Sequence, residues 1–156
     1  MISGARFTHA NLIARDWRAL AAFYESHLGC VVEPPFRDYS GPELEALTGV
    51  PGAALVGAHL RLPGAGEDAP TLEIFQYSRS EPGPAPAINR PGFGHIAFAV
   101  DSVGEARREV LAAGGTAVGE VTTLTTAAGD RVTACYVTDP EGNIIELQSW
   151  EQASPS

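Results

Sequence analysis

The sequence predicts an α+β protein built from two tandem βαβββ modules. Two observations indicate this: the order of predicted strands and helices is the same in both halves, and a proline-rich segment at 80–91 (SEPGPAPAINRP) separates them. With 156 residues, 44% hydrophobic and 19% charged, the chain has the size and composition of a single globular domain. We expect module 1 at about residues 5–79 and module 2 at about residues 92–151.

In module 1 the apolar residues of Asp16–Leu28 recur at helical spacing, so this segment is predicted to be a helix. Asp16 is a suitable N-cap and Gly29 a suitable C-terminal stop. A short helix is expected at Pro42–Leu47, inside an irregular stretch, Pro34–Gly52. Alternating patterns predict the strands of the module, with a turn-rich segment at 63–70 before the last of them: Arg6–Ala14, one that begins at Cys30–Val32, Ala53–Leu62 and Thr71–Tyr77.

Module 2 repeats this order. The patterns predict, in turn, a strand, a helix and three strands: Gly92–Val100, Ser102–Ala113, Ala117–Thr125, Arg131–Thr138 and Asn143–Trp150. The first strands match as RFTHANLIA and GFGHIAFAV, which aligns His9 with His95. The last strands match as TLEIFQY and IIELQSW, which aligns Glu73 with Glu146. The repeat therefore duplicates one His and one Glu.

Alternation in a strand places these four residues on faces opposite the aliphatic side chains that would pack on the helices. A single histidine in an apolar strand is usually a hydrogen-bonded core residue, and a single glutamate in a final strand usually points to solvent. Symmetrical recurrence favours another interpretation, because carboxylates in an apolar cavity are costly unless they are paired or metal-bound. The set predicts a divalent-metal site for Zn, Ni, Co, Mn or Fe(II), whose ligands are His9, Glu73, His95 and Glu146.

Composition argues against several classes of partner. The net charge is −9 and the ten basic residues are scattered, so nucleic acid is not expected to bind. No apolar run approaches the roughly 20 residues needed to span a bilayer, and the first residues do not resemble a signal peptide. Cys30 and Cys135 have no disulfide or metal spacing and are predicted to be buried. A cytoplasmic protein that acts on a small molecule is expected.

The segments FTHANLIARDWRALAAFYESHLGCVV, TLEIFQY, GHIAFAVDSVGEARREVLAAGG and YVTDPEGNIIEL resemble the vicinal oxygen chelate superfamily, which includes glyoxalase I, methylmalonyl-CoA epimerase, extradiol dioxygenases and bleomycin-type resistance proteins. The resemblance implies a cupped, incompletely closed mixed sheet with the helices outside. It implies one metal ligand from each of four strands, and pairing of the first and last strands of each module. It also implies a homodimer, with the site either inside one chain or shared between two.

The resemblance further implies a metal-dependent isomerase, lyase or epimerase that stabilises an enolate next to the carbonyl of a small acid or thioester. Glu146 is our choice for the mobile base, with Glu73 as its partner, although the roles could be exchanged. One alternative is an Fe(II) extradiol-type dioxygenase, although that class resembles a His, His, Glu triad with a non-ligating residue where Glu73 stands. The other is a non-catalytic binder of small molecules, a class that often lacks the ligands.

Two departures concern glutathione. Glyoxalase I carries an Arg four residues after the first His, where this chain has Ile13, and an Asn four residues after the second ligand, where it has Tyr77. The aliphatic Ile13 resembles the epimerase instead. Possible substrate contacts are polar or aromatic residues near the predicted ligands, on the first module's long loop and in the connector: Gln148, Trp150, Tyr77, Arg37, Asp38, Tyr39 and Arg90.

Overall fold

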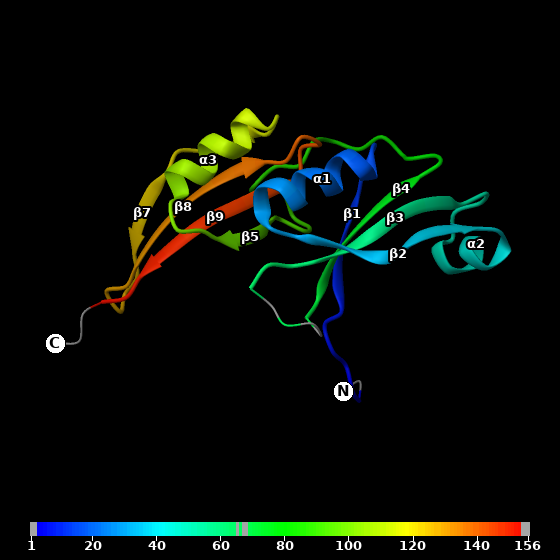
Figure 1. Ribbon diagram of the computed structural model, residues 1–156, viewed down its shortest axis with the longest axis horizontal. Helices are drawn as coiled ribbons and strands as arrows, with labels where there is room; N and C mark the ends of the chain where they lie inside the picture. Colours follow the sequence, from blue (N-terminus) through cyan, green and yellow to red (C-terminus); the bar gives the residue numbers. More distant parts are fainter. Residues whose placement is uncertain (1–2, 65, 67–68, 154–156) are drawn as a thin grey trace. The chain divides into compact units, whose positions relative to one another are not determined.

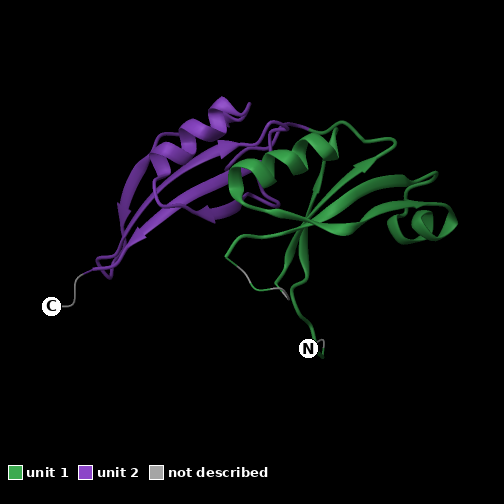
Figure 2. Ribbon diagram, viewed as in Figure 1, with its two compact units in different colours: residues 1–83 green, residues 84–156 purple. Residues whose placement is uncertain are grey.

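The computed structural model describes residues 3–64, 66 and 69–153. The chain forms two compact units, residues 1–83 and 84–156, and the boundary falls inside the proline-rich connector (Figure 2). The described connector residues, 80–91, form no helix or strand. Each unit contains one βαβββ module, so the predicted α+β class and the tandem repeat are confirmed.

Unit 1 holds a four-stranded sheet in the order β1-β4-β3-β2 (Figure 1). Strands β1 and β4 pair in parallel, and the other pairs are antiparallel. The elements in chain order are β1 (His9–Ile13), α1 (Trp17–Leu28), β2 (Val31–Ser40), α2 (Pro42–Thr48), β3 (Ala54–Arg61) and β4 (Thr71–Tyr77). The first and last strands of the module are therefore neighbours, as the resemblance implied.

Helix α1 begins and ends at the predicted residues. The Asp16 carboxylate accepts hydrogen bonds from the backbone N–H groups of Arg18 and Ala19, both at 3.1 Å, and so satisfies two free donors of the first turn. Gly29 ends the helix with φ of 67°, a left-handed conformation that glycine adopts without strain. The apolar face of α1 packs on β3 and β4, where Leu60 and Ile74 are fully buried.

Unit 2 holds a five-stranded sheet in the order β5-β9-β8-β6, with β7 also paired to β8. Strands β5 and β9 pair in parallel, in the same way as β1 and β4. Helix α3 packs on β8 and β9 and is capped by the side chain of Ser102. The elements in chain order are β5 (Ile96–Ala99), α3 (Val103–Ala112), β6 (Thr116–Ala117), β7 (Thr122–Thr125), β8 (Arg131–Thr138) and β9 (Ile144–Glu151).

Three predictions of secondary structure were wrong. The stretch from Pro34 was expected to be irregular, but β2 continues to Ser40 with a register shift between Glu33 and Arg37. Such a bulge accommodates prolines that cannot donate to the ladder. The strand expected at Ala117–Thr125 is two short strands, β6 and β7, and the strand expected at Gly92–Val100 is only β5. The short helix α2 is confirmed. The predicted turn at 63–70 lies partly outside the described residues.

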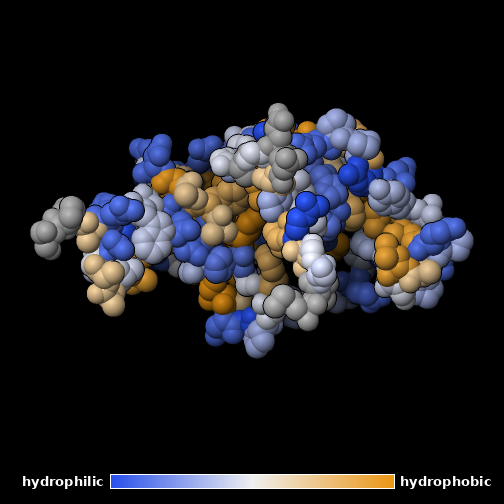
Figure 3. Space-filling view, turned by 90° about the horizontal axis from the view of Figure 1, so that it is seen from below, coloured by the Kyte–Doolittle hydropathy of each residue, from blue (hydrophilic) through white to orange (hydrophobic). Residues whose placement is uncertain are grey.

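The core of each unit lies between its sheet and its helix. Cys30 and Cys135 are buried there, as predicted, and burial raises the pKa of Cys30 to about 12, so this thiol stays protonated. Apolar surface remains at the α2 end of unit 1, where Leu47 is 83% exposed and Val50 is also exposed (Figure 3). None of the helices that the structure describes is long and apolar enough to cross a membrane.

Gly57, on β3, sits where the strand passes close to β4. A Cβ atom at this position would overlap the carbonyl oxygen of Ile74 and approach the ring of Phe75. Because the carbonyl belongs to the backbone of the neighbouring strand, neither strand can yield without disturbing the ladder. The absence of a side chain at Gly57 therefore permits the close approach of β3 to β4.

We predict that Gly57→Ala lowers the free energy of unfolding by about 1–3 kcal/mol through overpacking. Gly83→Ala is the matched control, because a Cβ at Gly83 meets no atom within 4 Å. Urea unfolding followed by circular dichroism would measure both. Equal unfolding midpoints for the two variants would contradict the argument.

Candidate metal centre

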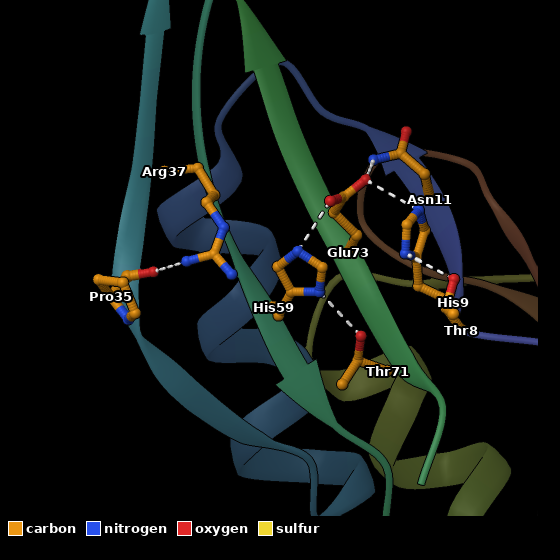
Figure 4. A network of polar contacts seen from close by, with 8 residues as sticks. All are labelled: Thr8, His9, Asn11, Pro35, Arg37, His59, Thr71 and Glu73. Atoms are coloured by element: carbon orange, nitrogen blue, oxygen red, sulfur yellow. Dashed lines mark hydrogen bonds and ion pairs between the residues drawn. The ribbon is translucent and has the colours of Figure 1, made fainter. Parts of the chain in front are cut away.

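Three side chains of module 1 meet on one face of its sheet, and each comes from a different strand. His9 lies on β1, His59 on β3 and Glu73 on β4 (Figure 4). One potential ligand atom from each residue lies within 4.8 Å of those of the other two. The register explains the convergence, since Glu73 is directly opposite Asn11 on one neighbouring strand and opposite His59 on the other.

The carboxylate of Glu73 is held at both of its oxygens. His59 Nε2 lies 2.8 Å from Oε1, and Asn11 Nδ2 donates a hydrogen bond of 2.8 Å to Oε2 (Figure 4). His9 Nε2 is farther away, at 3.6 Å from Oε2. Glu73 is only 9% exposed, so these contacts offset the cost of removing a charge from water. The looser His9 leaves its Nε2 available to a ligand.

His59 is fixed at both ring nitrogens. Its Nδ1 lies 2.8 Å from the hydroxyl of Thr71, and its Nε2 faces Glu73. Burial lowers the pKa of His59 and the negative charge of Glu73 opposes this, with burial the larger effect. The ring is therefore neutral near pH 7, and Thr71 O–H donating to Nδ1 leaves the proton on Nε2, from which it is donated to Glu73.

Module 2 repeats the His–Glu pair. His95, one residue before β5, places Nε2 at 2.9 Å from Oε2 of Glu146 on β9. Tyr136 stands directly opposite Glu146, and its phenol hydrogen-bonds to that carboxylate. Burial, together with the charge of Glu146 and this hydrogen bond, raises the pKa of Tyr136. The tyrosine therefore remains a neutral donor at physiological pH.

Each predicted histidine thus lies beside the glutamate of its own module, in the arrangement that the resemblance implied. Sequence reasoning missed His59. The available signal was a histidine between Ala58 and Leu60 in a mostly apolar strand, where alternation places it on the same face as Gly57 and Arg61. The repeat gave no help, because the register counterpart of His59 in module 2 is Tyr136.

The residues suggested for substrate contacts fall in several places. On β9, Trp150 Nε1 donates a 2.8 Å hydrogen bond to Gln148 Oε1, so these two side chains hold each other. On β2, the guanidinium of Arg37 donates to the carbonyl of Pro35 and lies on the same side of the sheet as His59 (Figure 4). Arg90 donates to the carbonyl of Ala85 in the connector.

Tyr77 lines a pocket of about 560 Å³ in unit 1, at the ends of β1 and β4. Ile13 lines the same pocket, on the strand face that also carries His9. The remaining lining is half apolar, from 50–53, and half polar or charged, from 78–81, where Arg79 and Glu81 lie. A pocket that combines apolar surface with a few charged groups, on the face that carries the His–Glu cluster, could accept a small molecule.

The donor set fits a divalent cation. Imidazole nitrogen and carboxylate oxygen together suit Zn, Ni, Co, Mn and Fe(II). His9, His59 and Glu73 have the identity of a two-histidine, one-carboxylate set, and the pair His95 and Glu146 adds the same two ligand types in module 2. Hydrogen bonds to the ligating carboxylate, like those of Asn11, are the usual support of such sites.

Comparison with known proteins agrees with this geometry. The chain matches the family model described as the glyoxalase/bleomycin resistance protein/dioxygenase superfamily over residues 6–147. No curated protein matches it. A glyoxalase family protein from Bacillus cereus superposes with a TM-score of 0.78 at 18% identity, covering 97% of this chain and 100% of that one.

Two further solved structures share the fold. A superfamily member from Sphaerobacter thermophilus gives a TM-score of 0.54 at 22% identity, covering 95% of this chain and 99% of that one. A domain of the same description from Frankia gives 0.55 at 16% identity, covering 99% and 96%. At these identities the structures show the fold alone. The family-model match spans most of the chain, and the protein belongs to the glyoxalase/bleomycin resistance protein/dioxygenase superfamily.

Proposed function

We propose that the protein is a divalent-metal-dependent isomerase, lyase or epimerase acting next to the carbonyl of a small acid or thioester. The proposed ligands of one metal ion are His9, Glu73, His95 and Glu146. The observation that carries the proposal is the repeated His–Glu pair, in which each module sets its first-strand histidine against the glutamate of its parallel last strand. Membership of a superfamily that commonly binds a divalent metal supports it.

A metal ion held by these residues would act as a Lewis acid on the substrate carbonyl. The protein must then move a proton on the adjacent carbon. In the proposed reaction Glu146 takes that proton as a carboxylate and returns it as a carboxylic acid, while the C–H electron pair shifts toward the carbonyl oxygen. Glu73 is the partner carboxylate, and the pocket beside Ile13 and Tyr77 is the proposed place for the non-reacting part of the substrate.

An Fe(II)-dependent dioxygenase is the second candidate, and one observation favours it. His9, His59 and Glu73 place two imidazoles and one carboxylate together within module 1. This set is typical of non-haem iron oxygenases, which leave the remaining positions of the metal open. The fourth proposed ligand argues for the isomerase or lyase, because the extradiol dioxygenases resemble a triad with a non-ligating residue where Glu73 stands.

Metal analysis of protein purified without added metal separates these functions. Zinc, nickel or cobalt at about one ion per chain would support the isomerase or lyase. Iron would support the dioxygenase. Protein that carries no metal and binds none on addition would contradict both and leave the alternative of a non-catalytic binder.

The proposed ligands are expected to act as one unit. We predict that each single alanine substitution at His9, Glu73, His95 or Glu146 weakens metal affinity by about 10-fold or more. His27→Ala is the control, because His27 is a histidine outside the proposed ligand set: it lies on helix α1, where it contacts the ring of Phe23. Competition with a chromogenic chelator would measure the affinities. Full affinity in both histidine variants, His9→Ala and His95→Ala, would show that the ligands are assigned wrongly.

The second prediction concerns the substrate. Where glutathione-dependent glyoxalase carries an anchoring Arg, this chain has Ile13, which cannot form a charge-assisted bond to a carboxylate. Loss of such a bond costs about 1.5–3 kcal/mol, or roughly 10- to 150-fold in binding. The metal-loaded protein should therefore catalyse deuterium exchange into α-acidic acids or thioesters but act poorly on the methylglyoxal–glutathione hemithioacetal. A kcat/KM of about 10⁴–10⁸ M⁻¹s⁻¹ on that hemithioacetal, the usual enzyme range, would refute this expectation.

We further propose a homodimer, in which the metal site either lies inside one chain or is shared between module 1 of one chain and module 2 of the partner. If the site is shared, mixing His9→Ala with His95→Ala chains should restore activity, because half of the sites in each mixed dimer are intact. With random exchange of chains the expected recovery is about a quarter of the wild-type activity, by the symmetry of a two-fold dimer. Sedimentation would establish the dimer, and recovery indistinguishable from either variant alone would place each site inside one chain.

A further inference from the structure

A row of residues crosses the whole sheet of unit 1 beside the candidate metal centre. It consists of Ile13 on β1, Phe75 on β4, Gly57 on β3 and Arg37 on β2, each directly opposite the next. Residues that are directly opposite share a face of the sheet, and Gly57 is two residues before His59, so the row lies on the face that carries the centre. Arg37 and Ile13 therefore stand at opposite ends of this row.

The side chain of Arg37 ends beside the candidate metal centre. Its guanidinium extends from β2 toward the ring of His59 (Figure 4). The residue opposite Arg37 is Gly57, which has no side chain to stand in its way. Burial is the main cause that lowers the pKa of His59, and the positive charge of Arg37 lowers that pKa further. The charge of Arg37 therefore acts directly on a residue of the centre.

Arg37 has no carboxylate partner among the described residues. Its guanidinium donates to the carbonyl of Pro35, which occupies one of its five N–H groups. Asp38 follows in the sequence, but alternation directs it to the other face of the sheet. Arg61, the other arginine on this face of the four strands, is neutralised, because its Nε lies 2.9 Å from Oε1 of Glu33. Of these two arginines, Arg37 is thus the one whose charge is not balanced by a carboxylate.

A divalent cation bound at the candidate metal centre would leave two positive charges on the same face of the sheet. These charges repel each other unless an anion lies between them. The chain as a whole carries a net charge of −9, which repels anions, so a local positive charge is needed to attract one. A carboxylate suits the guanidinium, because its oxygens accept two parallel N–H hydrogen bonds. A phosphate, with up to two negative charges and three acceptor oxygens, would call for more than one cation.

We propose that Arg37 binds a carboxylate of the substrate. The substrate is then a short oxo acid, in which the carboxylate and the reacting carbonyl are separated by a few bonds. Diagonal neighbours on paired strands, such as Arg37 and His59, are only about 7–8 Å apart, and the long arginine side chain covers much of that distance. The inference rests on the proposed function and selects the acid over an uncharged thioester. It does not restore the glutathione anchor, because Arg37 lies at the other end of the row from Ile13.

Two ligands that differ in charge but hardly in size, acetoacetate and acetoacetamide, test the proposal. Calorimetric titration of the zinc-loaded protein would measure both affinities. Arg37→Gln should weaken acetoacetate binding by about 10- to 150-fold, since a charge-assisted bond is lost, and change acetoacetamide binding by less than about 2-fold. Arg37→Lys should recover part of the loss, because it keeps the charge without the planar fork of donors.

Arg18→Gln is the matched control. It removes the same charge from the helix side of the sheet, where Cζ of Arg18 lies 4.4 Å from the centre of the Trp17 ring, and it should leave both affinities unchanged. Arg37→Gln should also tighten zinc binding in the absence of acetoacetate, by about 2- to 10-fold, because a like charge is removed from beside the centre. A merely structural role of Arg37 would instead weaken the binding of zinc and of both ligands together. Thermal unfolding of each variant establishes that the fold is intact.

Three results would overturn the proposal. Acetoacetate affinity that is unchanged in Arg37→Gln would show that the carboxylate is bound elsewhere. An equal loss for acetoacetate and acetoacetamide would show that Arg37 acts through the fold. In a parallel titration, a loss confined to inorganic phosphate would identify a phosphate site instead.

These titrations need no turnover. A wild type that binds zinc but exchanges none of the substrates contradicts the proposed reaction, while the affinities still decide the role of Arg37. If the wild type binds no zinc, the same comparison of wild type with Arg37→Gln in the metal-free protein, followed by NMR, decides it.

Discussion

Parallel pairing between the first and last strands of a module, β1 with β4 and β5 with β9, joins the two ends of each module. Because these two neighbouring strands run in the same direction, the helix and the intervening strands of each module form one long crossover connection between them. The register pairs Glu73 with Asn11 and Glu146 with Ala97, so each histidine lies two residues before the residue opposite the glutamate of its module. From that position His95 Nε2 lies 2.9 Å from Glu146 Oε2.

Within this sheet of module 1, side chains alternate along each strand, and the two faces of the sheet are therefore chemically different. Leu72 and Ile74 point toward α1 and are buried, while Glu73 between them points to the opposite face. A carboxylate that is 9% exposed is tolerable only with partners, and Asn11 and His59 supply them. The helix-facing side thus provides the apolar burial that stabilises the module, and the other side carries the polar network.

Much of this could be predicted from the sequence, for identifiable reasons. Helix α1 has both capping signals, Asp16 and Gly29, and β4 alternates cleanly from Thr71 to Tyr77, so their bounds were predicted to within one residue. The repeat located four candidate ligands because duplication preserved them. Only the family resemblance, and not the periodicity, indicated that β1 and β4 are neighbours.

The misses arise where local signals are weak or conflict with tertiary context. Pro34 and Pro35 suggested a loop, but β2 is an edge strand, where missing donors are tolerated, and it continues to Ser40. His59 could not be identified from a repeat that replaces it with Tyr136. Its role becomes visible only once the register of β3 on β4 sets it opposite Glu73.

The difference between Asn11 and Ala97 bears on how a chain with two matching modules could arise. A half-length ancestor that paired with a copy of itself would carry identical surroundings at both carboxylates, so any substitution would change both at once. Fusion of two copies into one chain removes that coupling, and each copy can then vary alone. The preserved His–Glu pairs and the altered residues beside them are what such a history would leave: two modules with the same framework whose surroundings at the matching carboxylates have diverged.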